Sequence, residues 1–190
     1  ARYRVSRIVK RERSSRSPAP YITSKLQQDA ANRLGMQPNR TMRVAQALYE
    51  GIALGKGKNA ETVGLITYMR TDSVRLSNEA VEECRQYVAT TYGEKLLPDK
   101  PNRFKSKSKG VQDAHEAIRP TRMDLPPDAV RNYLTDERFK LYKLIWDRFV
   151  ACQMIPALYD QTSVEIDAQA GERRYGLRAS GSILRVPGWK

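Results

Sequence analysis

Hydrophobic residues recur at helical spacing through the middle of the chain. The pattern predicts helices over residues 24–34, 41–50, 78–92 and 135–153, and Pro126-Pro127 opens a further short helix. Start and stop signals flank these helices: Ser24 with Gln27 as a capping box, Thr41, Ser77 and Thr135 as N-caps, and Gly35, Gly51 and Gly93 as ends. The first two helices are joined by a turn, which resembles a helix-turn-helix.

Alternating apolar and polar residues predict strands near both ends of the chain. Residues 2–13 alternate weakly, and the stretch after Pro156 alternates clearly enough to predict an antiparallel sheet. A short apolar run from Val63 to Tyr68 predicts one more strand, preceded by a loop over residues 51–62. Residues 97–110 lack periodicity and predict a basic surface loop. The expected fold class is therefore α+β.

A strong positive charge narrows the choice of partners. The net charge is +13 and the isoelectric point is about 9.9, which predicts attraction to polyanions. No apolar run approaches the roughly 18 residues of a membrane span. Cys84 and Cys152 have no paired spacing, which is typical of reduced thiols in a cytosolic protein, and a single histidine makes a zinc site unfavourable.

The candidate chemistry lies in the segment GLITYMRTDS, residues 64–73. If residues 68–70 are extended, Tyr68 and Arg70 share one face. A phenol can attack phosphorus, and an arginine can hold phosphate oxygens while charge builds on them. The alternative is a buried strand tyrosine beside a surface arginine. Asp72 is expected to accept hydrogen bonds from nearby backbone amides, because one isolated carboxylate makes a poor Mg²⁺ site.

This segment resembles the active-site sequence of type IA DNA topoisomerases, specifically the bacterial topoisomerase I group. Two further segments resemble signatures of the same family: AHEAIRPT over residues 114–121 and YITSKLQQ over residues 21–28. The three segments occur in the family's order, and the resemblance covers nearly the whole chain.

The resemblance implies a role for individual residues. Tyr68 would be the nucleophile that forms a transient 5′-phosphotyrosine link with single-stranded DNA, and Arg70 and His115 would act on the scissile phosphate. The remaining matched residues would contact DNA: Arg119, Thr71, Ser73, Thr23 and Ser24. A helical turn would place His115 and Arg119 on one face, and Glu116 has no assigned role.

The resemblance also implies a domain plan. A winged-helix-like helical domain (18–156) would be inserted into an incomplete antiparallel β domain, formed by residues 1–17 and 157–190. The chain would be a central fragment of a cytoplasmic protein of the bacterial nucleoid. Its missing toprim domain would bind the Mg²⁺ that the full-length enzyme needs, so this chain would bind no metal. The fragment alone would bind DNA without relaxing it.

Two other functions stay open at this point. One is a non-catalytic nucleic-acid-binding module that uses its basic surface and its helix-turn-helix alone. A purely structural β scaffold is a third class, but it leaves the matched segments unexplained.

Overall fold

The structure, a computed structural model, describes residues 1–55, 61–104 and 115–190. The chain divides into two compact units: Ala1–Ser17 with Ile155–Lys190, and Pro18–Met154. Helices and antiparallel strands both occur, so the predicted α+β class is confirmed. Within the described residues, no helix is long and apolar enough to cross a membrane.

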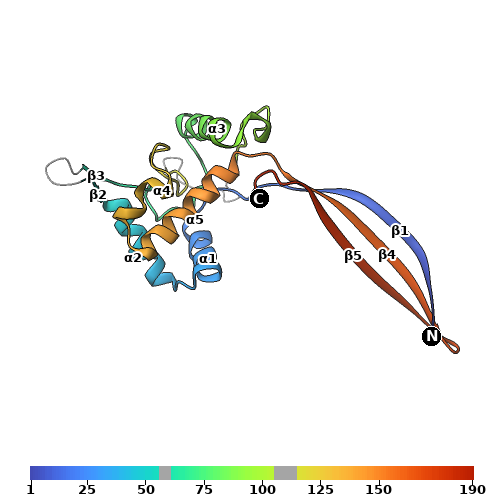
Figure 1. The fold of residues 1–190 in the computed structure, drawn as a ribbon. Coiled ribbons are helices and arrows are strands. Elements are labelled where there is room, and N and C mark those ends of the chain that lie inside the picture. Colours follow the sequence, from blue (N-terminus) through green and yellow to red (C-terminus); the bar gives the residue numbers. More distant parts are fainter. Residues whose placement is uncertain (56–60, 105–114) are drawn as a thin grey trace. The chain divides into compact units, whose positions relative to one another are not determined.

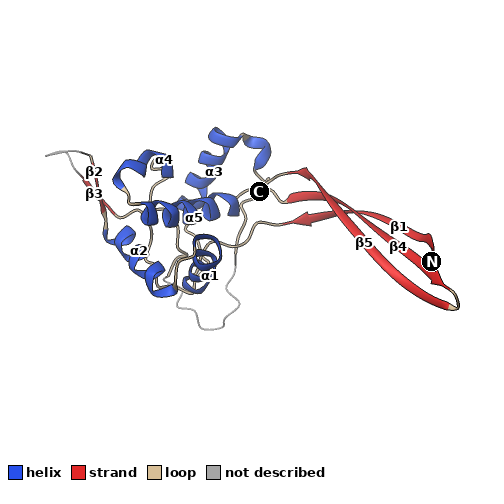
Figure 2. Ribbon diagram, turned by 60° about the horizontal axis from the view of Figure 1, so that its bottom comes forward, coloured by secondary structure: helices blue, strands red, loops and turns tan. Residues whose placement is uncertain are grey.

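The first unit is a three-stranded antiparallel sheet in the order β1-β4-β5 (Figure 2). Its strands are β1 (Arg2–Ser15), β4 (Ala157–Ala170) and β5 (Arg173–Val186). Because β1 pairs with β4, residues from both ends of the sequence meet in one sheet. The expectation that this sheet belongs to a larger β domain stays a prediction.

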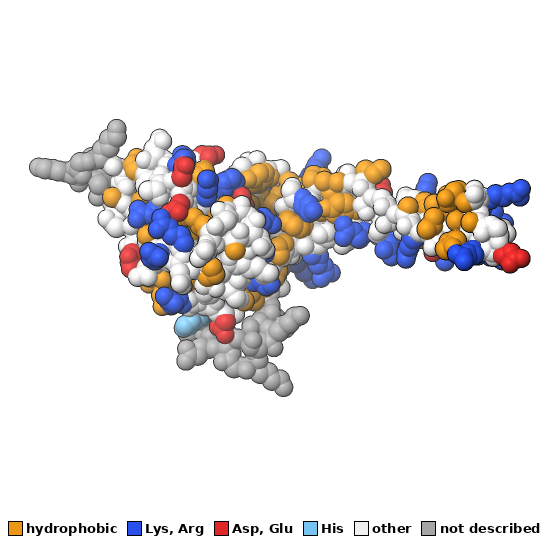
Figure 3. Space-filling view, turned by 90° about the horizontal axis from the view of Figure 1, so that it is seen from below, with side chains coloured by type: hydrophobic (Ala, Val, Ile, Leu, Met, Phe, Trp, Pro, Cys, Tyr) orange, Lys and Arg blue, Asp and Glu red, His pale blue; other side chains and the backbone are white. Residues whose placement is uncertain are grey.

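One side of this sheet is apolar, although the hydrophobic spacing in β1 is irregular. A register shift between Val5 and Arg7 inserts an extra residue, which returns Ile8 to the side that carries Tyr3 and Val5. These three residues pair with Val164, Ile166 and Ala168 of β4, which pair in turn with Ala179, Leu177 and Tyr175 of β5. Many of these side chains are exposed, and Figure 3 shows hydrophobic side chains gathered near one end of the sheet among Lys and Arg.

The second unit is built around one long helix, α5 (Asp136–Cys152), which packs against the other four (Figure 1). These are α1 (Thr23–Leu34), α2 (Pro38–Glu50), α3 (Asn78–Tyr92) and α4 (Pro127–Val130). A two-stranded hairpin of β2 (Ile52–Leu54) and β3 (Glu61–Val63) follows α2, and 3₁₀ turns cover Glu94–Leu96 and Arg131–Tyr133.

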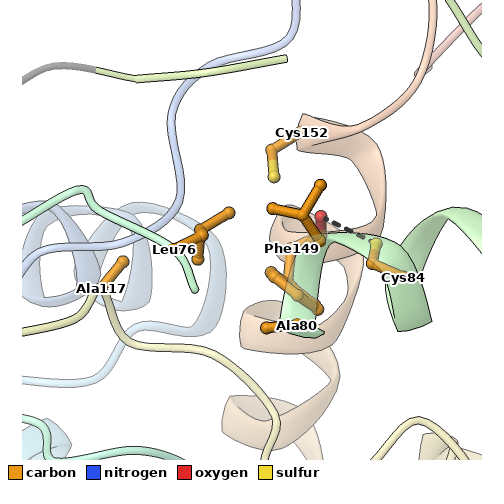
Figure 4. Packing of buried hydrophobic residues seen from close by; sticks show 7 residues of the cluster. Leu76, Ala80, Cys84, Ala117, Phe149 and Cys152 are labelled. Atoms are coloured by element: carbon orange, nitrogen blue, oxygen red, sulfur yellow. Dashed lines mark hydrogen bonds between the residues drawn. The ribbon is translucent and has the colours of Figure 1, made fainter. Parts of the chain in front are cut away.

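A buried cluster ties α3 and α5 to two loops (Figure 4). Phe149 and Cys152 of α5 pack with Ala80, Val81 and Cys84 of α3, and Leu76 and Ala117 complete the cluster from the loops. Both cysteines are free and buried, as the sequence predicts. Burial raises the pKa of the Cys84 thiol well above its usual range and that of Cys152 to about 12, so neither thiol is an active nucleophile.

The predicted caps are right for the two longest helices and wrong for the first two. Ser77 Oγ accepts from Ala80 N at 3.2 Å, and Thr135 Oγ1 accepts from Arg138 N at 3.5 Å. The capping box at Ser24 is wrong, because α1 starts at Thr23 without a side-chain cap. The cap at Thr41 is also wrong: α2 starts at Pro38, a residue pre-set for the first helical position, and Thr41 is buried inside the helix.

The predicted loop and strand around residue 60 need correction. Part of the 51–62 loop forms the β2-β3 hairpin, and its residues 56–60 lie outside the described residues, as do residues 105–110 of the basic loop over 97–110. The strand predicted to reach Tyr68 ends at Val63. After Val63, Ile66 forms a single bridge with Pro120, because this segment pairs with a distant loop at isolated points instead of along a ladder.

Candidate active site

The three segments that carry the family resemblance lie side by side in the helical unit. Backbone hydrogen bonds join residues 21–23, 65–75 and 115–121 to one another. The donors and acceptors are Ile118 N to Tyr21 O (2.8 Å), Thr23 N to Thr71 O (2.9 Å), Thr67 N to Arg119 O (2.9 Å), Ala117 N to Arg75 O (2.9 Å) and Thr121 N to Leu65 O (3.1 Å). The fold therefore gathers the predicted site residues, which are up to about a hundred positions apart in the sequence, around one loop.

The loop that carries Tyr68, residues 64–77, alternates in burial without being a strand. Met69, Thr71 and Ser73 are buried, whereas Tyr68 is 45% exposed and Arg70 and Asp72 are also exposed. Tyr68 and Arg70 are both exposed, but the chain bends at Met69, so the extended backbone on which their predicted shared face depended is absent. The buried residues anchor the loop, so that the tyrosine and the arginine project outward from a fixed backbone.

Thr23 fastens this loop to the start of α1. Its hydroxyl donates to Met69 O at 2.8 Å and accepts from Thr71 N at 2.8 Å, while Thr71 O accepts from Thr23 N. The Thr23 hydroxyl therefore both donates and accepts hydrogen bonds within the fold. This contact explains why α1 starts one residue earlier than the sequence predicts, with Thr23 as its first residue.

We expect Thr23→Val to loosen this loop while keeping the shape of the side chain. The Thr71 N–H then loses the Thr23 hydroxyl that accepts its hydrogen bond. Because Thr71 is only 8% exposed, this loss should lower the free energy of unfolding by about 1–3 kcal/mol. Chemical denaturation should show this loss in the free energy of unfolding. Ser24→Ala, at the exposed neighbour, is the matched control; an equal stability for Thr23→Val and the native chain would contradict the anchoring role.

Glu116, which the sequence left unassigned, joins the two loops of the site. Its Oε1 accepts from Ser77 N at 2.7 Å, at the start of α3, and its Oε2 forms an ion pair with Arg119 Nη2 at 2.8 Å. The chain from His115 to Arg119 is extended, so the helical face predicted for these two residues is wrong. Backbone hydrogen bonds from Ile118 to Tyr21 and from Thr67 to Arg119 hold this segment in its non-helical conformation.

Arg119 differs from Arg70 in what surrounds its charge. The Arg119 side chain is 15% exposed and is held by Glu116 and by the carbonyl oxygen of Pro120 at 3.0 Å. Arg70 is exposed, and within the described residues it forms no ion pair with a carboxylate. The guanidinium of Arg70 is therefore the one available to an incoming anion.

Two adjoining pockets bring the predicted catalytic side chains to one surface. The first, of about 300 Å³, is lined by Tyr68, Thr67, Thr71, His115 and Glu116. The second is lined by Arg70, Asp72, Thr71, His115 and the start of α1, including Ser24. Because Thr71 and His115 belong to both, Tyr68, Arg70 and His115 border one continuous region.

Thr71 and Ser73 shape the loop through their hydroxyl groups. Thr71 Oγ1 accepts from Ser73 N at 3.1 Å, and Ser73 Oγ accepts from Arg75 N at 3.2 Å. These are the amide contacts that the sequence assigned to Asp72, so that assignment is wrong: the acceptors are short hydroxyl side chains inside the loop. A contact of Thr71, Ser73, Thr23, Ser24 or Arg119 with DNA stays a prediction.

A second tyrosine near the site has a different character. Tyr21 is 1% exposed, donates to Asp29 at 2.7 Å and lies under the guanidinium of Arg148. Burial, with a further contribution from the Asp29 hydrogen bond, raises the pKa of the Tyr21 hydroxyl to about 12. Tyr21 is thus a structural residue, whereas Tyr68 is exposed to solvent and to a ligand.

Sequence reasoning missed two residues that support the site. Thr67 Oγ1 donates to Ala117 O at 2.7 Å and accepts from Arg119 N at 3.0 Å. Tyr49 of α2 places its ring against that of Tyr68, with centroids 5.3 Å apart. Neither contact has a local sequence signal, because the partners lie at least nineteen positions apart.

The described part of the chain offers no cluster of side chains suited to a metal ion. Across residues 1–55, 61–104 and 115–190, no group of three or more His, Cys, Asp or Glu side chains is placed to hold one. The carboxylates that line the two pockets, Glu116 and Asp72, lie one in each, and Glu116 is engaged by Arg119. These residues do not fit a Mg²⁺ site.

Comparison with known proteins shows the family to which the chain belongs. The chain is 47% identical over 188 residues to DNA topoisomerase 1 of Xylella fastidiosa strain Temecula1, covering 99% of this chain and 22% of that protein. It is 45% identical over 187 residues to DNA topoisomerase 1 of Helicobacter pylori strain 26695, covering 98% of this chain and 24% of that protein. The chain thus spans less than a quarter of the length of these relatives.

A solved structure gives the same result for the fold. The full-length topoisomerase I of Thermotoga maritima superposes with a TM-score of 0.81 at 34% identity, covering 98% of this chain and 29% of that one. The family described as DNA topoisomerase matches residues 1–190. With its sequence matched from the first residue to the last, the chain belongs to the DNA topoisomerase family.

Proposed function

We propose that this chain carries the nucleophile of a type IA DNA topoisomerase, and that Tyr68 attacks a phosphodiester of single-stranded DNA. The observation that carries the proposal is the placement of Tyr68: it is half exposed on an anchored loop, beside His115 in one pocket and next to the pocket that holds Arg70. Membership of the DNA topoisomerase family supports the same reading.

The proposed reaction exchanges one phosphodiester for another. The Tyr68 oxygen forms a bond to phosphorus as the bond from phosphorus to the 3′ oxygen breaks; the phenol proton leaves to solvent, and the departing 3′ oxygen takes up a proton. The product is a 5′-phosphotyrosine and a free 3′-hydroxyl. Attack by that hydroxyl reverses the step and reseals the strand, so the link conserves the bond energy and no nucleotide cofactor is consumed.

Arg70 and His115 are proposed to act on the phosphate during this exchange. The guanidinium of Arg70 is exposed and not engaged by a carboxylate of the described residues, so it can donate two hydrogen bonds to phosphate oxygens as negative charge builds on them. His115 lines both pockets and can donate a further hydrogen bond to the same group.

The whole protein is proposed to relax negatively supercoiled DNA by passing a second strand through the break. The relatives are about four times as long as this chain, so other domains of the same polypeptide would act with it. One of these, a toprim domain, would hold the Mg²⁺ of the full-length enzyme, since the residues described here do not fit that ion. This activity would place the protein with the DNA of the bacterial cytoplasm.

Mapping the covalent adduct tests the proposal. The full-length protein is incubated with a labelled single strand and denatured, and the DNA-linked peptide is then identified by mass spectrometry. We expect the modified peptide to contain residues 65–70, with the phosphate on Tyr68. An adduct on another residue would refute the proposal, and DNA binding without any adduct would favour the non-catalytic binding module.

We expect the 190-residue chain to bind single-stranded DNA with an affinity that falls steeply as salt rises. The net charge of +13 motivates this expectation. If about four phosphates are neutralised, the slope of log affinity against log salt is about −3. Fluorescence anisotropy over a series of salt concentrations measures the slope, and an affinity independent of salt would remove the electrostatic basis of the proposal.

The same chain is expected not to relax supercoiled plasmid, even with Mg²⁺ present. Strand passage requires both ends of the break to be held while a second strand moves between them, and the chain spans only 22–24% of the relatives' length. Agarose-gel analysis with the full-length protein as a positive control decides the matter. Relaxation by the pure 190-residue chain would mean that the remaining domains are dispensable.

A further inference from the structure

The last turn of α2 directly supports the loop that carries Tyr68. Leu65 N donates to Leu48 O at 2.8 Å, and a Cβ on Gly64 would lie 2.6 Å from Tyr49 O. Only a glycine at position 64 lets the two backbones approach this closely. The start of the Tyr68 loop is therefore fixed against the residues at the end of α2.

Tyr49 extends this support to the ring of Tyr68 itself. The two rings meet edge to face, with centroids 5.3 Å apart and planes at 66°. Both side chains project from the surface, since Tyr49 is 42% exposed and Tyr68 is 45% exposed. The core therefore cannot hold the Tyr68 ring, and the aromatic contact with Tyr49 restrains it on one side.

We propose that Tyr49 is a positioning residue: its ring fixes the orientation in which the Tyr68 hydroxyl meets the scissile phosphate. The inference rests on the proposed role of Tyr68 as nucleophile. An exposed tyrosine samples several rotamers, and each one moves the hydroxyl by several ångströms. An edge-to-face contact narrows this range before DNA binds, and reactions of this kind are sensitive to about 1 Å of misplacement.

The contact needs the aromatic ring of Tyr49 and makes no use of its hydroxyl. This separates the proposal from two other roles that an exposed tyrosine here can have. A tyrosine that stacks on a DNA base would contribute to affinity. A tyrosine that itself attacks the phosphate would need its oxygen. Removing the ring would lower the cleavage rate in the first role and the DNA affinity in the second. Removing the hydroxyl alone would lower the rate only in the third.

Single-turnover cleavage by the full-length protein distinguishes these roles. At saturating labelled single strand, Tyr49→Phe is expected to keep most of the native cleavage rate, and Tyr49→Ala is expected to lose about tenfold. The dissociation constant for DNA, measured by anisotropy, should be the same for both variants. The expected result is a loss in rate at constant affinity that is rescued by phenylalanine.

Two controls accompany this experiment. Tyr92→Ala removes another exposed tyrosine from an edge-to-face pair, that of Tyr87 and Tyr92 at 6.1 Å and 71°, and should cleave at the native rate. Tyr68→Phe should give no adduct; if it does give one, the proposed nucleophile is wrong, which is a separate failure. Thermal melting of each variant shows whether a slow variant is folded.

Three outcomes would overturn the positioning role of Tyr49. Cleavage by Tyr49→Ala at the native rate would show that the ring contact has no effect. A weaker affinity with an unchanged rate at saturation would assign Tyr49 to base stacking instead. A loss with Tyr49→Phe as large as with Tyr49→Ala would assign the effect to the hydroxyl. If Tyr49→Ala melts early, Tyr49→Leu, which keeps bulk without a ring, takes its place with the same expected loss.

Discussion

Tyr68→Phe in the full-length protein should abolish the covalent adduct with DNA and leave DNA affinity unchanged. The substitution removes the one oxygen that forms the bond to phosphorus, and it keeps the ring that contacts Tyr49. Because Tyr68 is 45% exposed and its hydroxyl has no hydrogen bond within the described part of the chain, the fold does not depend on that oxygen. The stability of the variant should therefore match that of the native protein.

Denaturing gels with an end-labelled single strand measure this effect, and anisotropy on the same samples measures affinity. Tyr21→Phe is a useful comparison, because Tyr21 is a buried tyrosine of the same site that bonds to Asp29. It should lower stability while still allowing an adduct. If Tyr68→Phe still forms the adduct, the nucleophile is another residue, and Tyr49 is the first candidate because its ring lies 5.3 Å away.

Arg70→Ala should slow cleavage about a hundredfold while the nucleophile stays in place. The removal of one donor aimed at a developing negative charge costs on the order of 3 kcal/mol, which corresponds to that factor in rate. The structure supports a direct effect, since Arg70 is exposed at the pocket that also contains His115 and makes no ion pair with a described carboxylate. Removing the Arg70 side chain should therefore change the free energy of unfolding little.

Arg70→Lys tests whether charge alone is sufficient. Lysine restores the positive charge without the two-pronged geometry of the guanidinium, so the rate should recover only in part. Arg43→Ala, which removes an exposed arginine of α2, controls for the general loss of positive charge. Rates come from quenched time courses at saturating DNA. Native cleavage by Arg70→Ala would mean that Arg70 has no electrostatic role in the reaction.

Several features could be predicted because they depend on residues close together in the sequence. The starts of α3 and α5 follow from Ser77 and Thr135, whose hydroxyls bond to an amide three residues later. Tyr68 and Arg70, two positions apart, are both exposed, although the backbone between them bends at Met69 and does not form the strand that the sequence predicts. The family resemblance follows from three short segments, and no long-range information was needed to recognise it.

The predictions were wrong where a residue bonds to a partner far away in the sequence instead of to a neighbour. Thr23 and Ser24 look like a helix cap, but the Thr23 hydroxyl bonds to the loop at Met69 and Thr71 instead. The segment after His115 has helical spacing, yet it is extended because its backbone pairs with Tyr21 and with the Tyr68 loop. In both cases a hydrogen bond across about fifty or more positions replaced the one expected locally.

The sequence by itself determined which reactive groups are present: a tyrosine and an arginine two positions apart, a single histidine and a strongly basic chain. It also determined where each long helix starts. Only the tertiary structure decided how these groups work together. It brought His115 to the pockets of Tyr68 and Arg70, used Glu116 to neutralise Arg119, and set Tyr49 against Tyr68. Local spacing specifies backbone conformation and the side on which a residue lies, whereas contacts between remote residues exist only after the core has packed and fixed the loops.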